Sequence, residues 1–414
     1  MESLEKNIQE VFGSSGLDVK IRGDKFIWAI IILLSICGLL VVYSATNTLA
    51  YKLHKGNTWV FLFRQFSIVL VGIVIVYFAH LVNYTIYSRW ARFLFFIAIL
   101  LLIYTLFFGT SLNEANRWIR LPVLNFTIQT SDLAKLALFM YLSRLLSKKQ
   151  EVIKDFKKGF LPLLVPILII CGLIAPDNLS TALLTGSTGM LLLFIGRVSM
   201  KHILIVVAVG AFFIGTLVFL ARAYYDEANG KSKELPAVLS IKRVATWIKR
   251  VQDFMYAKKD EAPYQVQQAK IAVANGGFFG LGPGNSEQRN FLPHPYSDFI
   301  YAIILEEYGL LGGAFILFIY MVFLFRAIKI FRKCSYAFGA FLSIALSFTL
   351  VIQAMANMAV NVGLFPVTGV TLPLVSMGGS SIIFTSIAIG IILSVGRNVE
   401  AMEGTLDNQS TATT

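Results

Sequence analysis

Residues 276–309 read GGFFGLGPGNSEQRNFLPHPYSDFIYAIILEEYG, and the rest of the chain is organised around this stretch. Five of its first nine residues are glycine. Glycine lets a backbone approach a ligand closely or adopt positive φ. A polar strip follows, and an apolar run begins at Asp298. Asp298 therefore lies where a chain leaving water would enter lipid, and this carboxylate is the first candidate for chemistry.

The composition predicts an all-α, polytopic integral membrane protein. The chain has 414 residues, of which 57% are hydrophobic and 14% charged, and its mean hydropathy is +0.72. Repeated apolar runs of about 17–25 residues indicate membrane-spanning helices. The three cysteines and four histidines show no ligand spacing, so we expect neither a disulfide nor a metal cluster. The formal charge of +13 reflects topology and does not indicate nucleic-acid binding.

The apolar runs predict about ten spans within a transmembrane domain at 26–396. Residues 1–25 form a polar N-terminal tail, and 397–414 form a polar tail that we expect to be disordered. Gly309, Gly312 and Gly313 are expected to bend the eighth span. The expected spans are 26–45, 59–80, 93–109, 131–147, 160–175, 182–196, 202–222, 298–325, 337–361 and 379–396.

The distribution of Lys and Arg predicts the orientation in the membrane. Nineteen of these residues flank one set of span ends, and four lie in the short loops opposite. The positive-inside rule then places both termini in the cytoplasm and the large 223–297 loop, between spans seven and eight, outside. The stretches rich in Gly, Pro and polar residues fall on this outer side. A transporter more often places its polar groups at mid-membrane, so the pattern favours an outward-facing active site.

The 110–130 loop and the span after it contain several charged candidates. Arg117 and Trp118, taken alone, are typical of an interfacial anchor. Asp132 and Lys135 are three residues apart and share a helix face. A cation at full membrane depth costs about 2.5–3.5 kcal/mol, so Lys135, and Arg64 in the second span, should face protein or a polar cleft.

Three further features have a structural interpretation beside a functional one. Asp177 follows a proline and reads as a turn or cap residue. Residues 238–255 have a basic amphipathic pattern that includes Arg243, so this helix either attracts anionic lipid headgroups or packs on other loops. Glu306 and Glu307 lie inside an apolar run. We read them as structural, paired or protonated, with Arg64 and Lys135 as candidate partners.

These motifs together resemble the SEDS family (shape, elongation, division and sporulation proteins) over roughly residues 20–400, and most closely its division branch. His294 and Tyr296 depart from the family pattern, which usually has Glu and His there. The shared elements are Arg117-Trp118-Ile119, Gln129, Ser131, Lys135, Pro176-Asp177, Tyr264-Gln265, Gln268-Ala269, Gly276-Gly277, Gly280, Gly282, Gly284, Ser286, Gln288, Leu292-Pro293, Asp298, Glu306-Glu307, Thr368-Gly369, Leu372-Pro373, Ser376 and Gly378-Gly379-Ser380-Ser381.

The resemblance implies a peptidoglycan glycosyltransferase that polymerises lipid II in septal wall synthesis at the bacterial inner membrane. Asp298 would be the general base, and a divalent cation beside it is left open; no other cofactor is evident. Partners would be a class B penicillin-binding protein, other division proteins and membrane lipids. Substrate-binding candidates are Arg117, Trp118, Lys135, Arg243, Gln268, Gly282, Gly284, Ser286, Gln288, Thr368 and Ser376.

Two other functions remain open at this point. A lipid II flippase would need a polar path through the membrane, which Arg64, Lys135, Glu306 and Glu307 could line. A non-catalytic division scaffold would need neither that path nor a base. Flipping makes the membrane-depth charges decisive, whereas polymerisation makes Asp298 decisive.

Overall fold

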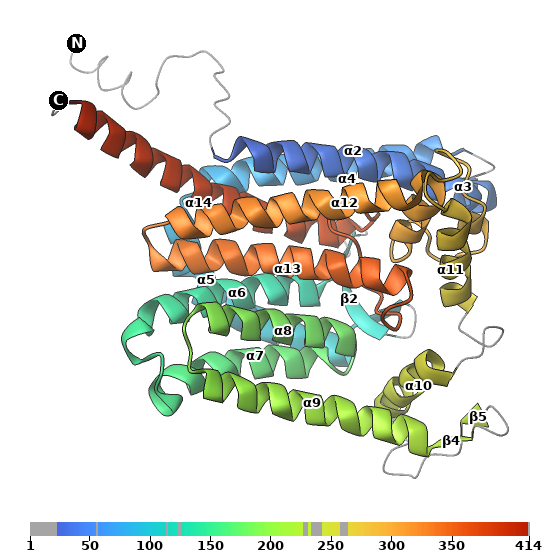
Figure 1. Ribbon diagram of the computed structural model, residues 1–414, viewed down its shortest axis with the longest axis horizontal. Coiled ribbons are helices and arrows are strands. Elements are labelled where there is room, and N and C mark those ends of the chain that lie inside the picture. Colours follow the sequence, from blue (N-terminus) through green and yellow to red (C-terminus); the bar gives the residue numbers. More distant parts are fainter. Residues whose placement is uncertain are drawn as a thin grey trace.

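The computed structural model describes residues 23–54, 57–112, 115–121, 126–226, 231–232, 242–256 and 264–412. Long helices run side by side, and most connections with irregular structure gather at one end (Figure 1). We call that end, which carries α3, the strands, α10, α11 and residues 277–299 and 362–378, the loop face. The long helices are α2 (Lys25–Ala45), α4 (Trp59–Leu81), α5 (Tyr84–Phe108), α6 (Thr130–Lys148), α7 (Leu161–Ile174), α8 (Leu179–Ile195), α9 (Met200–Ala223), α12 (Ile300–Lys333), α13 (Ala337–Asn361) and α14 (Gly379–Ala412).

Each of the ten predicted spans corresponds to one of these helices. In the described part of the chain, eight are long and apolar enough to cross a membrane: α2, α4, α5, α7 with the turn before it, α9, α12, α13 and α14. The shorter α8 has 17 residues, and α6 contains the charged pair Asp132 and Lys135. The multi-pass helical class is therefore established, while the count of ten crossings stays a prediction.

Three boundaries differ from the sequence predictions. Helix α5 begins at Tyr84, nine residues early, because Asn83 caps it by accepting a hydrogen bond from the Thr85 amide. Helix α12 begins at Ile300, so Asp298 precedes its first turn. Helix α14 continues past Arg397 to Ala412, where disorder was predicted. A helix already nucleated within the bundle propagates at little cost into a polar segment that contains good helix formers.

The loop face also contains short elements that hydropathy did not predict. Strands β1 (Thr110–Leu112), β2 (Ala115–Leu121) and β3 (Phe126–Gln129) form an antiparallel sheet in which Trp118 faces Gln129. The other short elements are α3 (Asn47–His54), β4 (Tyr225–Asp226), β5 (Lys231–Ser232), α10 (Lys242–Tyr256), α11 (Tyr264–Gly276) and the 3-10 turn Gln288–Asn290; at the opposite end lie Gln150–Val152 and Phe156–Phe160.

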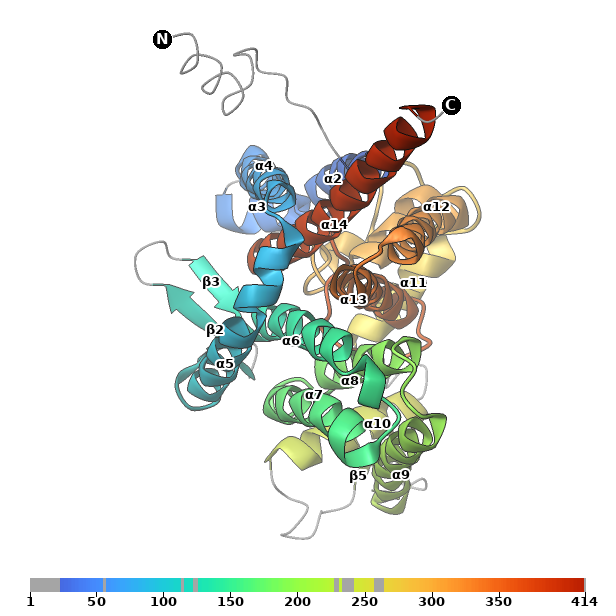
Figure 2. The same cartoon turned by 90° about the vertical axis from the view of Figure 1, so that its left-hand side faces the viewer.

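Helix α13 lies at the centre of the bundle and α9 at its edge (Figure 2). Helix α13 packs against α6, α8, α12 and α14, whereas α9 is mostly exposed and is held mainly by α10. Ile248 of α10 is buried against Leu217 and Ala221 of α9, and the Gln252 amide donates to the Ala221 carbonyl at 3.0 Å. The apolar stripe of the amphipathic helix is thus used in packing on another element.

Helix α12 is broken at Gly309. Residues 276–288, which we call the glycine loop, fill the break. Gly309 has φ 65° and ψ −167°, which leaves the carbonyls before it without helical partners. The Leu281 amide donates to the Glu306 carbonyl at 3.0 Å, and the Gly282 amide donates to the Glu307 carbonyl at 2.9 Å. Backbone groups inside a membrane protein need such partners because lipid supplies none.

The close approach explains why glycine stands at these positions. A Cβ at Gly280, whose φ is +83°, would lie 2.2 Å from the Glu307 carbonyl oxygen. A Cβ at Gly276 would lie 1.8 Å from the Leu305 carbonyl oxygen. Real contacts of this kind do not occur, so any side chain would force the loop away from α12.

We expect Gly280→Ala to destabilise the protein, because the strained φ alone costs about 1–3 kcal/mol and the methyl overlaps backbone. The thermal unfolding midpoint in detergent measures this loss. Gly210→Ala, on α9 with no neighbour within 4 Å, is the control and should leave the midpoint unchanged. Equal midpoints for both variants would contradict the packing role of the glycine loop.

Candidate active site

Hydrogen bonds from the 366–378 segment hold the backbone that leads to Asp298. The Met377 amide donates to the Tyr296 carbonyl at 2.8 Å. The Ser376 hydroxyl donates to the Ser297 carbonyl at 2.7 Å and accepts from the Leu372 amide at 2.8 Å. Ser376, proposed from the sequence as a substrate-binding residue, is buried and fixes the chain beside the carboxylate instead of presenting its hydroxyl to solvent.

Two asparagines of α13 hold the next carbonyl. The side-chain amides of Asn357 and Asn361 donate to the Asp298 carbonyl at 2.9 and 3.0 Å. Asn361 also accepts from the Ala302 amide at 3.0 Å, so it satisfies an amide in the first turn of α12. Both asparagines are buried. The backbone carbonyls of Tyr296, Ser297 and Asp298 are therefore all held by hydrogen bonds, while the Asp298 side chain stays half-buried at the loop face.

Tyr296 and Arg64 supply the electrostatic surroundings of Asp298. Burial raises the pKa of the Tyr296 phenol, the Asp298 charge raises this pKa further, and the Arg64 charge lowers it. The phenol therefore stays protonated at neutral pH. The charges of Asp298 and Arg64 both act on Tyr296. The Arg64 side chain is exposed, whereas the sequence predicts that it faces protein or a polar cleft. From the sequence, Arg64 is also a candidate partner of Glu306 and Glu307, whereas in the structure its charge acts on Tyr296.

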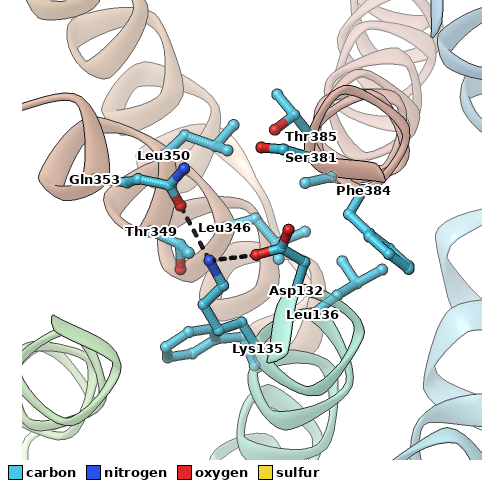
Figure 3. A pocket seen from close by; sticks show the side chains of 12 residues that line it. Asp132, Lys135, Leu136, Leu346, Thr349, Leu350, Gln353, Ser381, Phe384 and Thr385 are labelled. Carbon is cyan, nitrogen blue, oxygen red and sulfur yellow. Dashed lines mark hydrogen bonds and ion pairs between the residues drawn. The ribbon is translucent and has the colours of Figure 1, made fainter. Parts of the chain in front are cut away.

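Lys135 projects from α6 toward Gln353 of α13 (Figure 3). Its ammonium contacts Asp132 at 2.8 Å and the Gln353 side-chain oxygen at 3.0 Å. Gln353 in turn donates to the Thr371 carbonyl at 3.0 Å, in the segment that also holds the Asp298 backbone. The adjoining cavity has a volume of about 30 Å³, which is room for one or two water molecules. Lys135 is thus satisfied within the protein, and binding a substrate would require it to exchange a partner.

Glu306 and Glu307 hold the glycine loop in place of pairing with Lys135. Glu306 accepts from the Ser286 hydroxyl and from the Gln288 amide at 3.3 Å. Glu307 accepts from the Ser44 hydroxyl of α2 and from the Ser286 amide at 3.4 Å. Both acids are buried. Sequence reasoning missed these partners because they are mostly backbone amides, which residue type does not reveal.

The other candidates are distributed over the loop face. Gly282 and Gly284 have positive φ, Ser286 and Gln288 are buried against Glu306, and Gln268 is half-buried on α11. The Thr368 hydroxyl is buried and has no hydrogen-bond partner in the described part of the chain. These contacts leave the substrate roles of the six residues as predictions.

Four candidates remain: one lies in a turn, one in a strand, and the side chains of two lie outside the described residues. Asp177 lies in the turn before α8, and Asn178 is the residue that caps that helix by accepting from the Thr181 amide at 3.1 Å. Trp118 is half-buried in β2. The side chains of Arg117 and Arg243 lie outside the described residues.

The residues that sequence reasoning missed were Gln353, Asn357, Asn361 and Tyr296, together with the position of Arg64. Gln353, Asn357 and Asn361 recur every four residues inside an apolar span, which places three amides on one helix face. That spacing was a usable signal. Arg64 is the sixth residue of α4, so its height near the loop face was also readable.

The fold and the site together define a multi-pass helical membrane protein with a carboxylate fixed where a loop enters its eighth long helix. A model of the family of FtsW, RodA and SpoVE, described as "Cell cycle protein", matches residues 24–401. The chain belongs to this family, and the resemblance drawn from its motifs is confirmed.

Named relatives and solved structures agree with this assignment. The chain is 32% identical over 383 residues to the "Probable peptidoglycan glycosyltransferase FtsW" of Trichlorobacter lovleyi, covering 91% of this chain and 94% of the relative. It is also 32% identical over 388 residues to the "Stage V sporulation protein E" of Bacillus subtilis, covering 91% and 98%.

Two structures share the fold. One, described as "Structural coordination of polymerization and crosslinking by a peptidoglycan synthase complex", matches with a TM-score of 0.69 and 21% identity, covering 92% of this chain and 99% of that chain. The Thermus thermophilus rod shape determining protein RodA matches with a TM-score of 0.64 and 20% identity, covering 92% and 98%.

We expect Asn361→Ala to loosen the start of α12, because it removes the hydrogen bonds to the Asp298 carbonyl and from the Ala302 amide, each worth about 0.5–1.5 kcal/mol. Hydrogen–deuterium exchange of the peptide containing Ala302 should become faster, and the thermal midpoint should fall. Asn398→Ala, which removes a hydrogen bond within α14, is the control. Unchanged exchange at Ala302 would show that Asn361 does not hold this turn.

Proposed function

We propose that this protein is a peptidoglycan glycosyltransferase that joins lipid II units into glycan strands and releases undecaprenyl diphosphate. Relatives of similar length carry that activity in their names, and the chain shares their family. The observation that carries the proposal is Asp298, whose backbone is fixed through three successive carbonyls while its side chain stays half-buried at the loop face. A lipid-linked sugar would occupy the same boundary, with its chain in the bilayer and its sugars outside.

In the proposed reaction, Asp298 acts as a general base. Its carboxylate takes the proton from an acceptor sugar hydroxyl while that oxygen forms a bond to the donor anomeric carbon. The bond between the anomeric carbon and the diphosphate oxygen breaks, and undecaprenyl diphosphate leaves with the electron pair. A positioned base of this kind contributes about 10²–10⁴-fold to the rate. Fixing the carbonyls around Asp298 lowers the cost of orienting it.

Cations near Asp298 would stabilise the charge that develops on the leaving diphosphate. Arg64 is a candidate, because its charge acts on Tyr296, two residues before Asp298. Lys135 lies deeper, below Gln353, and would have to leave Asp132 or Gln353 to reach a phosphate. Arg117 and Arg243 remain candidates by sequence.

The geometry supports polymerisation over flipping. A flippase must pass a sugar and a diphosphate beside the membrane-depth charges. The cavity at Lys135 admits only about 30 Å³, and the two acids Glu306 and Glu307 are buried in contact with the glycine loop. In this conformation neither group lines a passage for a headgroup.

We further propose that a class B penicillin-binding protein cross-links the product, that other division proteins join the complex at the septum, and that surrounding membrane lipids contact α10. A solved structure of the same fold is described as coordinating polymerization and crosslinking. We propose that the reaction needs no protein-held cofactor, with a divalent cation at Asp298 as the alternative. The described residues contain no group of three His, Cys, Asp or Glu side chains suited to a metal.

The proposed orientation places the loop face outside the cell and both termini in the cytoplasm. A cysteine-free variant carrying Ser232→Cys should react with an impermeant thiol reagent in intact spheroplasts. Lys201→Cys, at the opposite end of α9, should react only after permeabilisation. The reverse pattern would overturn the orientation and the mechanism that depends on it.

The decisive substitution is Asp298→Asn, which keeps the side-chain shape but cannot accept the proton. Polymerisation of purified lipid II should fall at least about 10²-fold, while folding and membrane insertion stay normal. Asp155→Asn, at the opposite end of the bundle, is the matched control and should retain wild-type rate. Near wild-type polymerisation by Asp298→Asn would remove the catalytic assignment. If the wild-type protein moves lipid II between leaflets without polymerising it, and Asp298→Asn abolishes that movement, the protein is a flippase.

A further inference from the structure

A groove of ligand size lies at the loop face between α10, α11 and residues 363–367. Its volume is about 580 Å³, within the range of about 300–1,000 Å³ typical of small-molecule sites. The Lys135 cavity, by comparison, holds only one or two waters. Of these two cavities, the groove is the one whose size matches a sugar ligand.

Two short stretches of chain connect the groove to the backbone of Asp298. Pro293, one of its lining residues, precedes Asp298 by five residues, which span at most about 17 Å of chain. Gly363, on another wall, is two residues beyond Asn361, whose amide donates to the Asp298 carbonyl at 3.0 Å. The segment that leads to Asp298 and the segment that follows α13 therefore both line the groove.

The groove carries exposed aromatic rings and more positive than negative charge. Phe254, Tyr264 and Phe365 line it and are each at least half-exposed. Arg250 and Lys270 contribute two positive charges to the lining, and Asp253 contributes one negative charge. Aromatic faces pack against the C–H faces of sugar rings, and cations pair with carboxylates. The lining thus fits a sugar chain that carries acidic substituents.

All lining segments lie outside the membrane-spanning helices. Both reactants are tied to the bilayer by a polyprenyl chain, so the diphosphate at the end of each must stay near membrane level. The strand already made is longer, is water-soluble over most of its length and must leave along a surface outside the bilayer. Of the two reactants, the strand is the one that this groove can follow.

We propose that the groove between α10, α11 and residues 363–367 binds the growing glycan strand through its sugar rings and its stem-peptide carboxylates. This inference rests on the proposed polymerase function. It predicts that the groove controls strand length, because it retains the product between additions, and that it is not needed for the first coupling of two lipid II molecules.

The test uses the full chain in nanodiscs and the double variant Tyr264→Ala/Lys270→Gln. Both side chains are exposed, so the fold should tolerate their loss. The probe is a soluble, lipid-free oligomer of disaccharide-pentapeptide units. We expect the variant to bind it about tenfold more weakly, equivalent to about 1.4 kcal/mol. With lipid II, it should make shorter strands at an unchanged rate of first coupling.

Arg222→Gln is the matched control, since it removes an exposed cation from the end of α9 near the loop face without touching the groove. It should match wild type in both measurements. Wild-type affinity and strand length in the double variant would overturn the inference. So would a variant that loses binding to anionic vesicles but not to the oligomer, since the groove would then be a membrane contact.

Failure of the polymerase function can be distinguished from failure of the groove assignment. If the wild-type protein makes no glycan from lipid II, the polymerase function is wrong, whatever the groove binds. If it makes glycan and the double variant is indistinguishable from it, only the assignment of the groove is wrong.

Discussion

The break in α12 and the loop that fills it are the constraint on which the loop face depends. At Gly309 the helix leaves the α-conformation, and the carbonyls of Glu306 and Glu307 accept amides from the glycine loop. The side chains of the same two acids hold the next part of that loop. In lipid, unpaired backbone groups each cost several kcal/mol, so neither the break nor the loop is stable without the other.

This arrangement gives Gly276 and Gly280 a structural role, while the substrate roles of Gly282 and Gly284 stay predictions. Gly276 and Gly280 approach the backbone of α12 so closely that a methyl group would not fit. The loop is therefore a rigid part of the scaffold, and it fixes where the following segment, with Asp298 at its end, re-enters the bundle. The carboxylate proposed as the base lies on a long connection of more than seventy residues, so it needs such an anchor to keep one geometry.

A second set of contacts runs along α13 and links membrane depth to the loop face. Gln353 contacts Lys135, and Asn357 and Asn361 contact the Asp298 carbonyl. Amides suit this task because each donates and accepts without adding charge to the interior. The same helix face thus connects the cation proposed for the diphosphate with the carboxylate proposed as the base. A shift of α13 would move both together.

The sequence by itself determined the helical membrane class, the ten apolar segments, the family and the boundary position of Asp298. These features depend on hydropathy, charge and motif order, which are local along the chain. The tertiary structure decided what the glycines touch, which groups satisfy Glu306 and Glu307, that the charges of Arg64 and Asp298 both act on Tyr296, and that a groove opens beside α11. Each of these depends on contacts between segments far apart in sequence. Residue type shows that a buried acid needs a partner, but only the packing of the helices determines which backbone or side chain comes close enough to supply it.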